Sequence, residues 1–304
     1  MSVCLVIIYN HRFEQNINKL NSYYKDRFDH IYHVIPFYQS EDENVITVYE
    51  NSHQFNGYIA QAFKSFYSEK FGNYVFAGDD LLLNPSINQN NITAKLNLKP
   101  NSAYIKNLYG VGEVYIPWYH IPKILYKFVS AKGINIKNEI PDKVQAEKIA
   151  LSHGMKNQNF KFKNFIKHVF VAKTPLTLFK NLAYTLGFAY LKRFRKILEI
   201  PYPIVVGYSD FFVIPKSSIH DFIHYCGVFA GMNLFVEAAI PTALLLSSEK
   251  IQCQSKSFKG VEIWKESEIE ELMIQNELSV ENLFKNNSDK LYFHPIKLSK
   301  WNIK

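Results

Sequence analysis

A short apolar run that ends in two adjacent carboxylates constrains this chain more than any other stretch of its sequence. Residues 74–77 read Tyr-Val-Phe-Ala, an uninterrupted apolar run of the kind that fills a strand buried on both faces. Gly78, Asp79 and Asp80 follow directly, and Leu81 resumes the apolar surface. The pattern therefore predicts a buried strand whose carboxyl end presents a pair of acidic side chains.

Two adjacent carboxylates at the mouth of a buried strand repel each other, so one of them should have a raised pKa. A divalent cation removes that cost, and carboxylate oxygens facing diphosphate oxygens suit Mg²⁺ or Mn²⁺. Asp79 and Asp80 are therefore candidate metal ligands. The alternative is a polar turn, in which aspartate is common because its side chain hydrogen-bonds the nearby backbone.

The first part of the chain alternates strand-like and helical patterns. This alternation predicts an α/β fold, with a mixed, mainly parallel sheet flanked by helices, of the Rossmann-like kind. Ligands of such sheets lie beyond the carboxyl ends of the strands, so the loops after residues 9, 49 and 77 should share one crevice. The predicted strands span residues 3–9, 29–37, 45–49 and 74–77, and the predicted helices span residues 17–24 and 57–71.

Polar side chains follow the first and third predicted strands and should line that crevice. Arg12 can pair with a phosphate and Asn10 with a base edge or a ribose, and Asn51 is the candidate after the third strand. The alternatives are a helix-face position for Arg12 and helix capping by Asn10. Neither G-x-G-x-x-G nor G-x-x-x-x-G-K-[ST] occurs in the sequence, so it has neither a dinucleotide fingerprint nor a P-loop.

The composition predicts a large folded core. Of the 304 residues, 47% are hydrophobic and 15% are aromatic, which excludes wholesale disorder. No run of about 18 apolar residues occurs and no charged leader precedes the first strand-like run, so we expect neither a membrane span nor a signal peptide. Three widely spaced cysteines argue against a disulfide framework or a zinc site and favour a cytoplasmic location.

Residues 148–198 are both basic and strongly apolar, with eleven Lys or Arg and no Asp or Glu. A helical pair of this composition is suited to the headgroup region of an anionic membrane. One alternative is an ordinary buried helix pair with a basic, solvated edge. A nucleic-acid surface comes third, and we expect no nucleic-acid partner because no nucleic-acid-binding motif accompanies the stretch.

The last third of the chain adds two carboxylates. Residues 204–208 and 211–215 suggest a strand pair, or one bent strand, around Asp210. Glu237 lies in a strongly apolar stretch, where an unpaired carboxylate would be protonated or costly. Glu237 therefore either meets a cation or hydroxyl, as in a structural ion pair, or takes part in chemistry.

A histidine and a lysine lie in the aromatic, strand-like segment near the end of the sequence. His294 would complete a metal site as a third ligand beside Asp79 and Asp80. The alternative is an ordinary surface imidazole. Lys297 follows it three residues later.

Together these residues resemble the nucleotide-sugar-dependent glycosyltransferases of the GT-A fold. The likeness rests on an N-terminal α/β sheet, a strand ending in an acidic pair, an acidic residue at the head of a later helix, and a His near the C-terminus. It covers roughly the first quarter and the last third of the chain. The stretch Glu237 to Pro241 looks most like the exostosin-type branch, in which an acidic residue in an apolar segment lies beside the anomeric carbon. The acidic element here is Gly-Asp-Asp rather than Asp-x-Asp.

The resemblance implies metal-dependent transfer of a sugar from a nucleoside-diphosphate donor, a UDP-sugar first of all, to a polysaccharide or glycolipid acceptor. Asp79, Asp80 and His294 would hold Mn²⁺ or Mg²⁺ against the diphosphate. Glu237 or Asp210 would act as general base on the acceptor hydroxyl, or stabilise an oxocarbenium-like centre. The donor-binding residues would be Asn10, Arg12, Asn51, Asp79 and Lys297.

The implied organisation is one catalytic domain with an insertion. Residues 1–147 would form the nucleotide-sugar-binding half, 148–200 a basic helical insertion, and 201–304 the acceptor-binding half. Such an enzyme would work in the cytoplasm on a capsule, lipopolysaccharide or similar polymer, with the basic stretch at the inner membrane face.

Two other functions stay open. A nucleotidyltransferase uses a similar sheet, paired aspartates and Mg²⁺, but brings a glycine-rich loop after the first strand, where this chain has Asn-His-Arg-Phe. A non-enzymatic membrane- or polyanion-binding protein would use the sheet as a scaffold.

Overall fold

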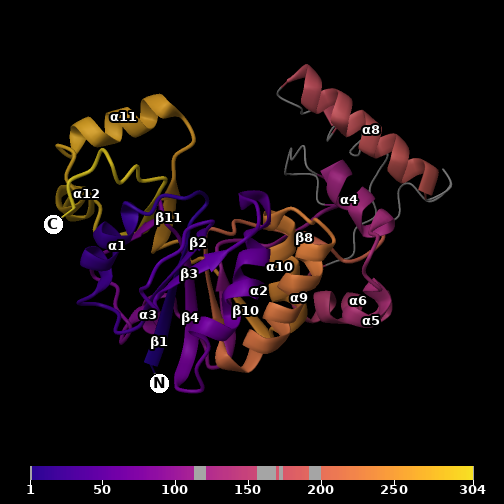
Figure 1. Ribbon diagram of the computed structural model, residues 1–304, viewed down its shortest axis with the longest axis horizontal. Helices are drawn as coiled ribbons and strands as arrows, with labels where there is room; N and C mark the ends of the chain where they lie inside the picture. The colour runs from indigo at the N-terminus through magenta and orange to yellow at the C-terminus, as the bar shows by residue number, and fades with distance from the viewer. Residues whose placement is uncertain (1, 113–120, 156–168, 171–173, 192–199, 304) are drawn as a thin grey trace.

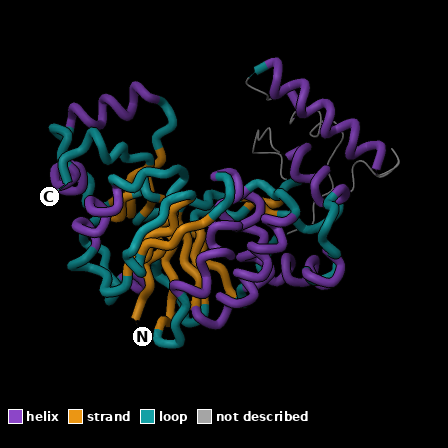
Figure 2. Tube along the Cα trace, viewed as in Figure 1, coloured by secondary structure: helices purple, strands orange, loops and turns teal. Residues whose placement is uncertain are grey.

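A seven-stranded sheet with helices on both faces forms the centre of the computed structural model (Figures 1 and 2). The structure describes all residues except 1, 113–120, 156–168, 171–173, 192–199 and 304. The seven strands are β1 (Ser2–Ile8), β2 (Ile31–Pro36), β3 (Val45–Val48), β4 (Phe71–Gly78), β6 (Ser102–Ile105), β9 (Phe211–Pro215) and β10 (Lys250–Cys253).

The strands lie in the order β10-β6-β9-β4-β1-β2-β3. All neighbouring pairs are parallel except those of β9, which runs antiparallel to both β4 and β6. The predicted α/β fold with a mixed, mainly parallel sheet flanked by helices is therefore confirmed. β9 and β10 come from the last third of the chain, so the two predicted halves share one sheet.

The sheet is buried on both faces because β1 sends alternate side chains into two separate cores. Cys4, Val6 and Ile8 pack into one core, whereas Val3, Leu5 and Ile7 pack into the other. The first core lies under α2 (Phe55–Phe66), α9 (Ile219–Gly231) and α10 (Val236–Ser247), and the second under α1 (Asn16–Tyr24), α3 (Ile92–Lys95), α11 (Glu266–Gln275) and α12 (Val280–Asn286).

Two small sheets and a group of helices complete the described fold. One sheet joins β11 (Lys259–Glu262), β12 (Lys290–His294) and β5 (Leu82–Leu83), and the other joins β7 (Tyr109–Gly110) to β8 (Val205–Val206). The remaining elements are α4 (Ile121–Ser130), α5 (Ile136–Glu139), α6 (Lys143–Ser152), α8 (Pro175–Leu191) and the short 3₁₀ turns η1 (Ser52–Gln54) and η3 (Lys216–Ser218).

Two sequence predictions need correction. The helix expected over residues 57–71 is α2, which ends at Phe66, and Phe71 already begins β4. The segments 204–208 and 211–215 do not pair with each other, because β8 pairs with β7 whereas β9 joins the central sheet. The chain between them is tied elsewhere, with the backbone N–H of Gly207 donating to the carbonyl of Glu237 at 3.0 Å.

The basic stretch is described only in part. Its predicted start at residue 148 falls inside α6, so the boundary does not coincide with an element. α8 is the long helix of its described portion and lies beside α4, away from the central sheet (Figure 1). None of the helices within the described ranges has the length and apolar character needed to cross a bilayer.

Candidate active site at the carboxyl edge of the sheet

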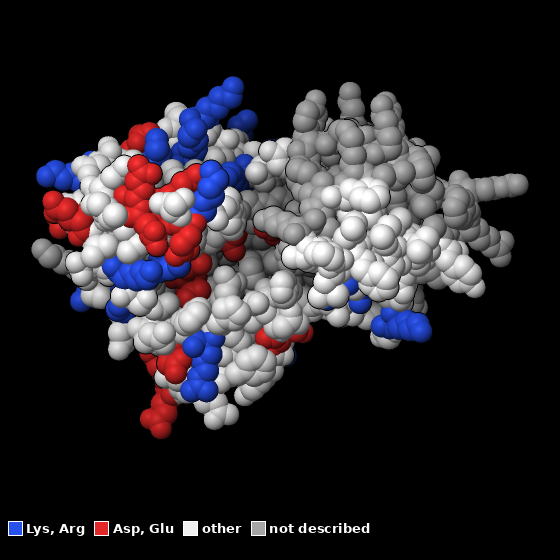
Figure 3. All heavy atoms as spheres, turned by 90° about the horizontal axis from the view of Figure 1, so that it is seen from above, with Lys and Arg blue, Asp and Glu red and all other residues white. Residues whose placement is uncertain are grey.

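A cavity of about 730 Å³ lies at the carboxyl end of β1, between β2 on one side and β4 on the other. The order of the parallel strands reverses there, and open α/β sheets bind ligands at such a switch point. Viewed from above, acidic side chains lie in a hollow near the middle of the molecule (Figure 3). The cavity walls come from the loop after β1, η1, the end of β4, the residues before β9, the start of α10 and the segment after β12.

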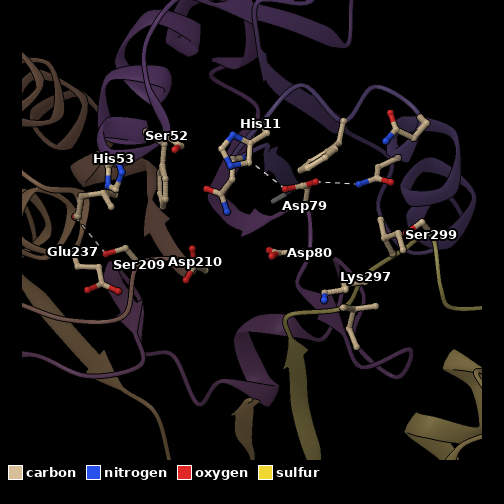
Figure 4. Close-up of a pocket in the computed structure, with 18 of the residues that line it drawn as sticks. His11, Ser52, His53, Asp79, Asp80, Ser209, Asp210, Glu237, Lys297 and Ser299 are labelled. Carbon is tan, nitrogen blue, oxygen red and sulfur yellow. Dashed lines mark hydrogen bonds between the residues drawn. The ribbon is translucent and has the colours of Figure 1, made fainter. Parts of the chain in front are cut away.

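Asp79 is buried at the end of β4, where two N–H groups face its carboxylate (Figure 4). The backbone N–H of Asn10 donates to Oδ1 at 3.4 Å, and the Asn16 side chain donates to Oδ2 at 3.1 Å. Burial, and after it the charge of Asp80, raises the pKa of Asp79 to about 7. We expected one of the two adjacent carboxylates to have a raised pKa, and that carboxylate is Asp79.

Asp80 meets His294 because β5 and β12 pair directly behind them. The antiparallel register sets Leu83 against Tyr292 and Leu82 against Phe293. Asp80 Oδ1 then lies 3.3 Å from Nε2 of His294. Burial lowers the pKa of His294, but the carboxylates led by Asp80 outweigh it, so the pKa lies above its ordinary value of 6.5.

Asp210 reaches the same corner through the pairing of β4 with β9. The backbone N–H of Gly78 donates to the carbonyl of Asp210 at 2.9 Å. A Cβ on Gly78 would lie 3.3 Å from Asp80 Oδ1 and 3.7 Å from the Cβ of Asp210, so glycine leaves space for the Asp80 carboxylate and for the close approach of Asp210. Burial raises the pKa of Asp210 to about 6, although the nearby His294 opposes the shift.

Glu237 lies on the opposite wall, in the first turn of α10 (Figure 4). Burial, with a smaller contribution from the charge of Asp210, raises the pKa of Glu237 to about 7. The N-terminus of α10 favours the ionised form, but it does not offset the burial. Glu237 also borders a second, smaller cavity of about 330 Å³.

The structure places six of the nine predicted site residues on the wall of the larger cavity and leaves Arg12, Asn51 and His294 outside that lining. His294 is buried beside Asp80. Arg12 instead forms an ion pair with Glu14 at 3.5 Å and lies over the ring of Tyr38. Asn51 caps η1, where its Oδ1 accepts from the backbone N–H of His53. The predicted residues that line the larger cavity are Asn10, Asp79, Asp80, Asp210, Glu237 and Lys297.

Several other residues of the cavity wall do not stand out in the sequence. Asn16 orients Asp79, yet the only feature of the sequence that marks Asn16 as a site residue is its position after the first strand. Ser209 precedes Asp210, and its hydroxyl donates to the carbonyl of Val236 at 3.5 Å. Phe13 and Phe55 offer aromatic surface to a ligand, but aromatic residues are frequent throughout this chain.

The donor types for a divalent cation are present, although the described part of the chain holds no preassembled group of three or more His, Cys, Asp or Glu ligands. Asp80 and His294 supply one carboxylate and one imidazole at 3.3 Å from each other. The Nδ1 atom of His294 is buried and has no hydrogen-bond partner among the described residues. A carboxylate oxygen and an imidazole nitrogen both suit Mn²⁺, so the residue types fit the ion. Ligation by Asp79, whose oxygens face N–H donors, stays a prediction.

Three comparisons with known proteins gave no match. Neither the family models, nor the curated proteins, nor the solved structures contain a significant relative of this chain. The functional argument therefore rests on the geometry and chemistry of the cavity.

Glu237→Gln should stabilise the ligand-free protein at alkaline pH. The pKa of Glu237 in the folded protein is about 7, above its ordinary value of 4.5, so ionisation costs nothing below pH 4.5 and its full cost is reached above pH 7. Since Glu237 is partly exposed to the cavity, we expect the variant to gain about 1–2 kcal/mol at about pH 8 and nothing at about pH 4.5.

Urea unfolding at both pH values measures this difference in free energy. The exposed Glu249→Gln is the matched control and should change stability by less than about 0.5 kcal/mol. An equal gain at both pH values would mean that ionisation of Glu237 carries no cost in the folded protein.

Proposed function

We propose that this protein is a metal-dependent glycosyltransferase of the GT-A kind, which moves a sugar from a nucleoside-diphosphate donor to a glycan or glycolipid acceptor. One observation carries the proposal. The acidic pair at the end of β4 and the Glu237 carboxylate at the start of α10 face each other across one cavity at the switch point of the sheet. The volume of this cavity lies within the range of ligand-binding sites.

The arrangement of the sheet supports a nucleotide donor. The order β3-β2-β1-β4 is that of the first four strands of doubly wound nucleotide-binding sheets, whose ligands lie at the switch point between the first and fourth strands. The aromatic rings of His11 and Phe13, which pack edge-to-face at 5.7 Å, line the cavity beside this point. They offer a stacking surface for a nucleobase.

The opposite end of the cavity suits a diphosphate. Lys297 lines the wall and pairs with Glu266 at 2.5 Å, and its exposed ammonium group can turn to a phosphate. Asp80 and His294 would hold Mn²⁺ or Mg²⁺, which would supply further positive charge against the diphosphate oxygens. The buried Asp79 keeps Asn10 and Asn16 in place behind this point.

Glu237 is placed to receive a proton from the acceptor. The acceptor oxygen forms a bond to the anomeric carbon, the bond from that carbon to the phosphate oxygen breaks, and the nucleoside diphosphate leaves with the electron pair. The hydroxyl proton moves to the carboxylate of Glu237, whose pKa of about 7 suits a general base. Asp210 contributes negative charge toward the sugar, where positive charge develops.

Two features favour this function over its alternatives. A nucleotidyltransferase needs cations in the loop after β1, but Arg12 of that loop pairs with Glu14. A scaffold protein has no use for buried carboxylates whose raised pKa values destabilise the fold, whereas active sites gather such groups. The pKa is raised for Asp79, Asp210 and Glu237 alike.

Asp80→Ala and His294→Ala should each abolish Mn²⁺-dependent hydrolysis of a UDP-sugar, because each removes a donor group from the corner that faces the diphosphate. Both variants should also lose the increase in melting temperature that UDP with Mn²⁺ gives the wild type. Hydrolysis is measured on a panel of UDP-, GDP- and CMP-sugars, with circular dichroism as the check on folding. Asp26→Ala on the surface serves as the control, and normal turnover in either site variant removes that residue from the mechanism.

Glu237→Gln should bind UDP and Mn²⁺ normally, yet turn over at least about a hundredfold more slowly, because the amide accepts no proton. The wild-type rate should rise as pH increases through about 7, since the base must be ionised to act, and the variant should lose this rise. Steady-state kinetics across that range measure both effects. Unchanged turnover would mean that Glu237 is structural.

A further inference from the structure

The second cavity shares Glu237 with the larger one and is built differently. Its volume is about 330 Å³, and its walls include Tyr109, Trp264 and the Lys106–Glu262 pair. Trp264 lies between β11 and α11 and is 71% exposed, although tryptophan normally buries most of its surface. An exposed tryptophan at a cavity rim offers a flat apolar surface to a ligand.

The polar groups of this cavity are fixed in place. Lys106 and Glu262 form an ion pair, and the Tyr292 hydroxyl donates to the other carboxylate oxygen of Glu262. The Lys106 ammonium also lies 5.2 Å from the centre of the Tyr208 ring. Such a network fixes the hydrogen-bonding groups at the base of a site, so little conformational entropy is lost when a ligand binds to them.

We propose that this second cavity binds the acceptor glycan, with a pyranose ring stacked on Trp264 and its hydroxyls directed to the Lys106–Glu262 pair. One face of a pyranose presents C–H groups and packs against aromatic rings, whereas its edge carries hydroxyls. Glu237 borders both cavities, so a sugar in the second one brings a hydroxyl to the base. This proposal rests on the proposed function.

Saturation-transfer NMR with short neutral oligosaccharides tests the proposal without nucleotide or metal. Cellotriose, maltotriose and triacetylchitotriose are the probes, and the wild type should bind at least one of them. Trp264→Ala should weaken that binding about tenfold, whereas Trp264→Phe should retain most of it because the stacking surface remains. Tyr49→Ala removes another exposed aromatic ring and is the matched control.

Binding to none of the three probes, or equal binding by wild type and Trp264→Ala, would overturn the proposal. The donor side is measured separately through the melting temperature with UDP and Mn²⁺. A protein that binds UDP with Mn²⁺ but no glycan would leave the proposed function standing and refute this cavity as the acceptor site. Glycan binding without any effect of UDP would refute the donor site instead.

α8 also carries a stripe of exposed apolar side chains. Its side toward α4 includes Tyr184, packed on the ring of Tyr126 at 5.5 Å, and Gly187, which faces the same ring. The opposite face has apolar residues at helical spacing, so they form one stripe. Its members, Leu176, Phe179, Leu182, Leu186 and Tyr190, are 39–85% exposed.

The positive charge near this stripe favours an anionic partner. Lys180 lies at its edge, and the charges of Lys127 and Lys180 act together with burial to lower the pKa of Lys123, so the three lysines lie close together. Residues 148–198 contain eleven Lys or Arg and no acidic residue. Two copies that meet through Lys123, Lys127 and Lys180 would repel each other, whereas an anionic lipid surface attracts these lysines.

We infer that α8 lies on an anionic membrane surface with its apolar stripe in the headgroup region. The helix has 17 residues, and no described helix is suited to cross a bilayer, so the contact is along the surface. Figure 1 shows α8 on the side of the molecule toward which the parallel strands point. The larger cavity lies at the carboxyl ends of those strands. A lipid-linked acceptor would therefore reach the site from the membrane.

Sedimentation with phosphatidylcholine vesicles, with and without phosphatidylglycerol, tests this inference. The wild type should bind the anionic vesicles, and the double variant Phe179→Ser with Leu186→Ser should partition at least about tenfold less, because two exposed apolar side chains no longer enter the lipid. Tyr49→Ser with Ile274→Ser, also exposed but remote from α8, should bind like the wild type.

Equal vesicle binding by both double variants, or no binding by the wild type, would refute the membrane contact. Light scattering on the same proteins shows whether the stripe joins two copies of the chain. Loss of a dimer in the α8 variant alone would assign the stripe to self-association and overturn the inference.

Discussion

The pairing of β5 with β12 is the contact on which the candidate site depends. β5 has only two residues, yet it follows Asp80 directly and sets the end of β12 beside it. The backbone N–H of Ile296 donates to the Asp80 carbonyl at 2.6 Å, and the Asn84 side chain donates to the carbonyls of Ser288 and Lys290. These bonds hold together the carboxylate of Asp80 and the imidazole of His294, which lie far apart in the sequence.

The cavity gathers carboxylates at a cost to the fold. Burial raises the pKa of Asp79, Asp210 and Glu237, so each is destabilising when ionised. Apolar side chains of the surrounding strands and helices pack on both faces of the sheet, and this packing offsets the loss of stability. Carboxylates that destabilise the fold, in a protein whose large core tolerates them, are typical of sites selected for chemistry rather than stability.

The sequence predicted the strands that are buried on both faces, because β1 and β4 give unbroken apolar runs. It did not reveal that β8 and β9 belong to different sheets, since an apolar run carries no information on its partner. The rule that strand ends gather ligands predicted that Asn10 and Asp79 share one crevice. It did not predict Asp210, which reaches the same corner because β9 runs antiparallel to β4. Nor did it predict the position of Arg12, because a local contact with Glu14 decides where its side chain points.

The position of β9 affects how the chain assembles. β9 lies between β4 and β6, although about a hundred residues separate it from β6 in the sequence, so the N-terminal strands cannot close against β6 by themselves. During synthesis, the edge of β4 that pairs with β9 stays unpaired until β9 is made, much later. A fragment that stops before β9 would expose that edge to other chains, so the two halves are interdependent in folding as well as in chemistry.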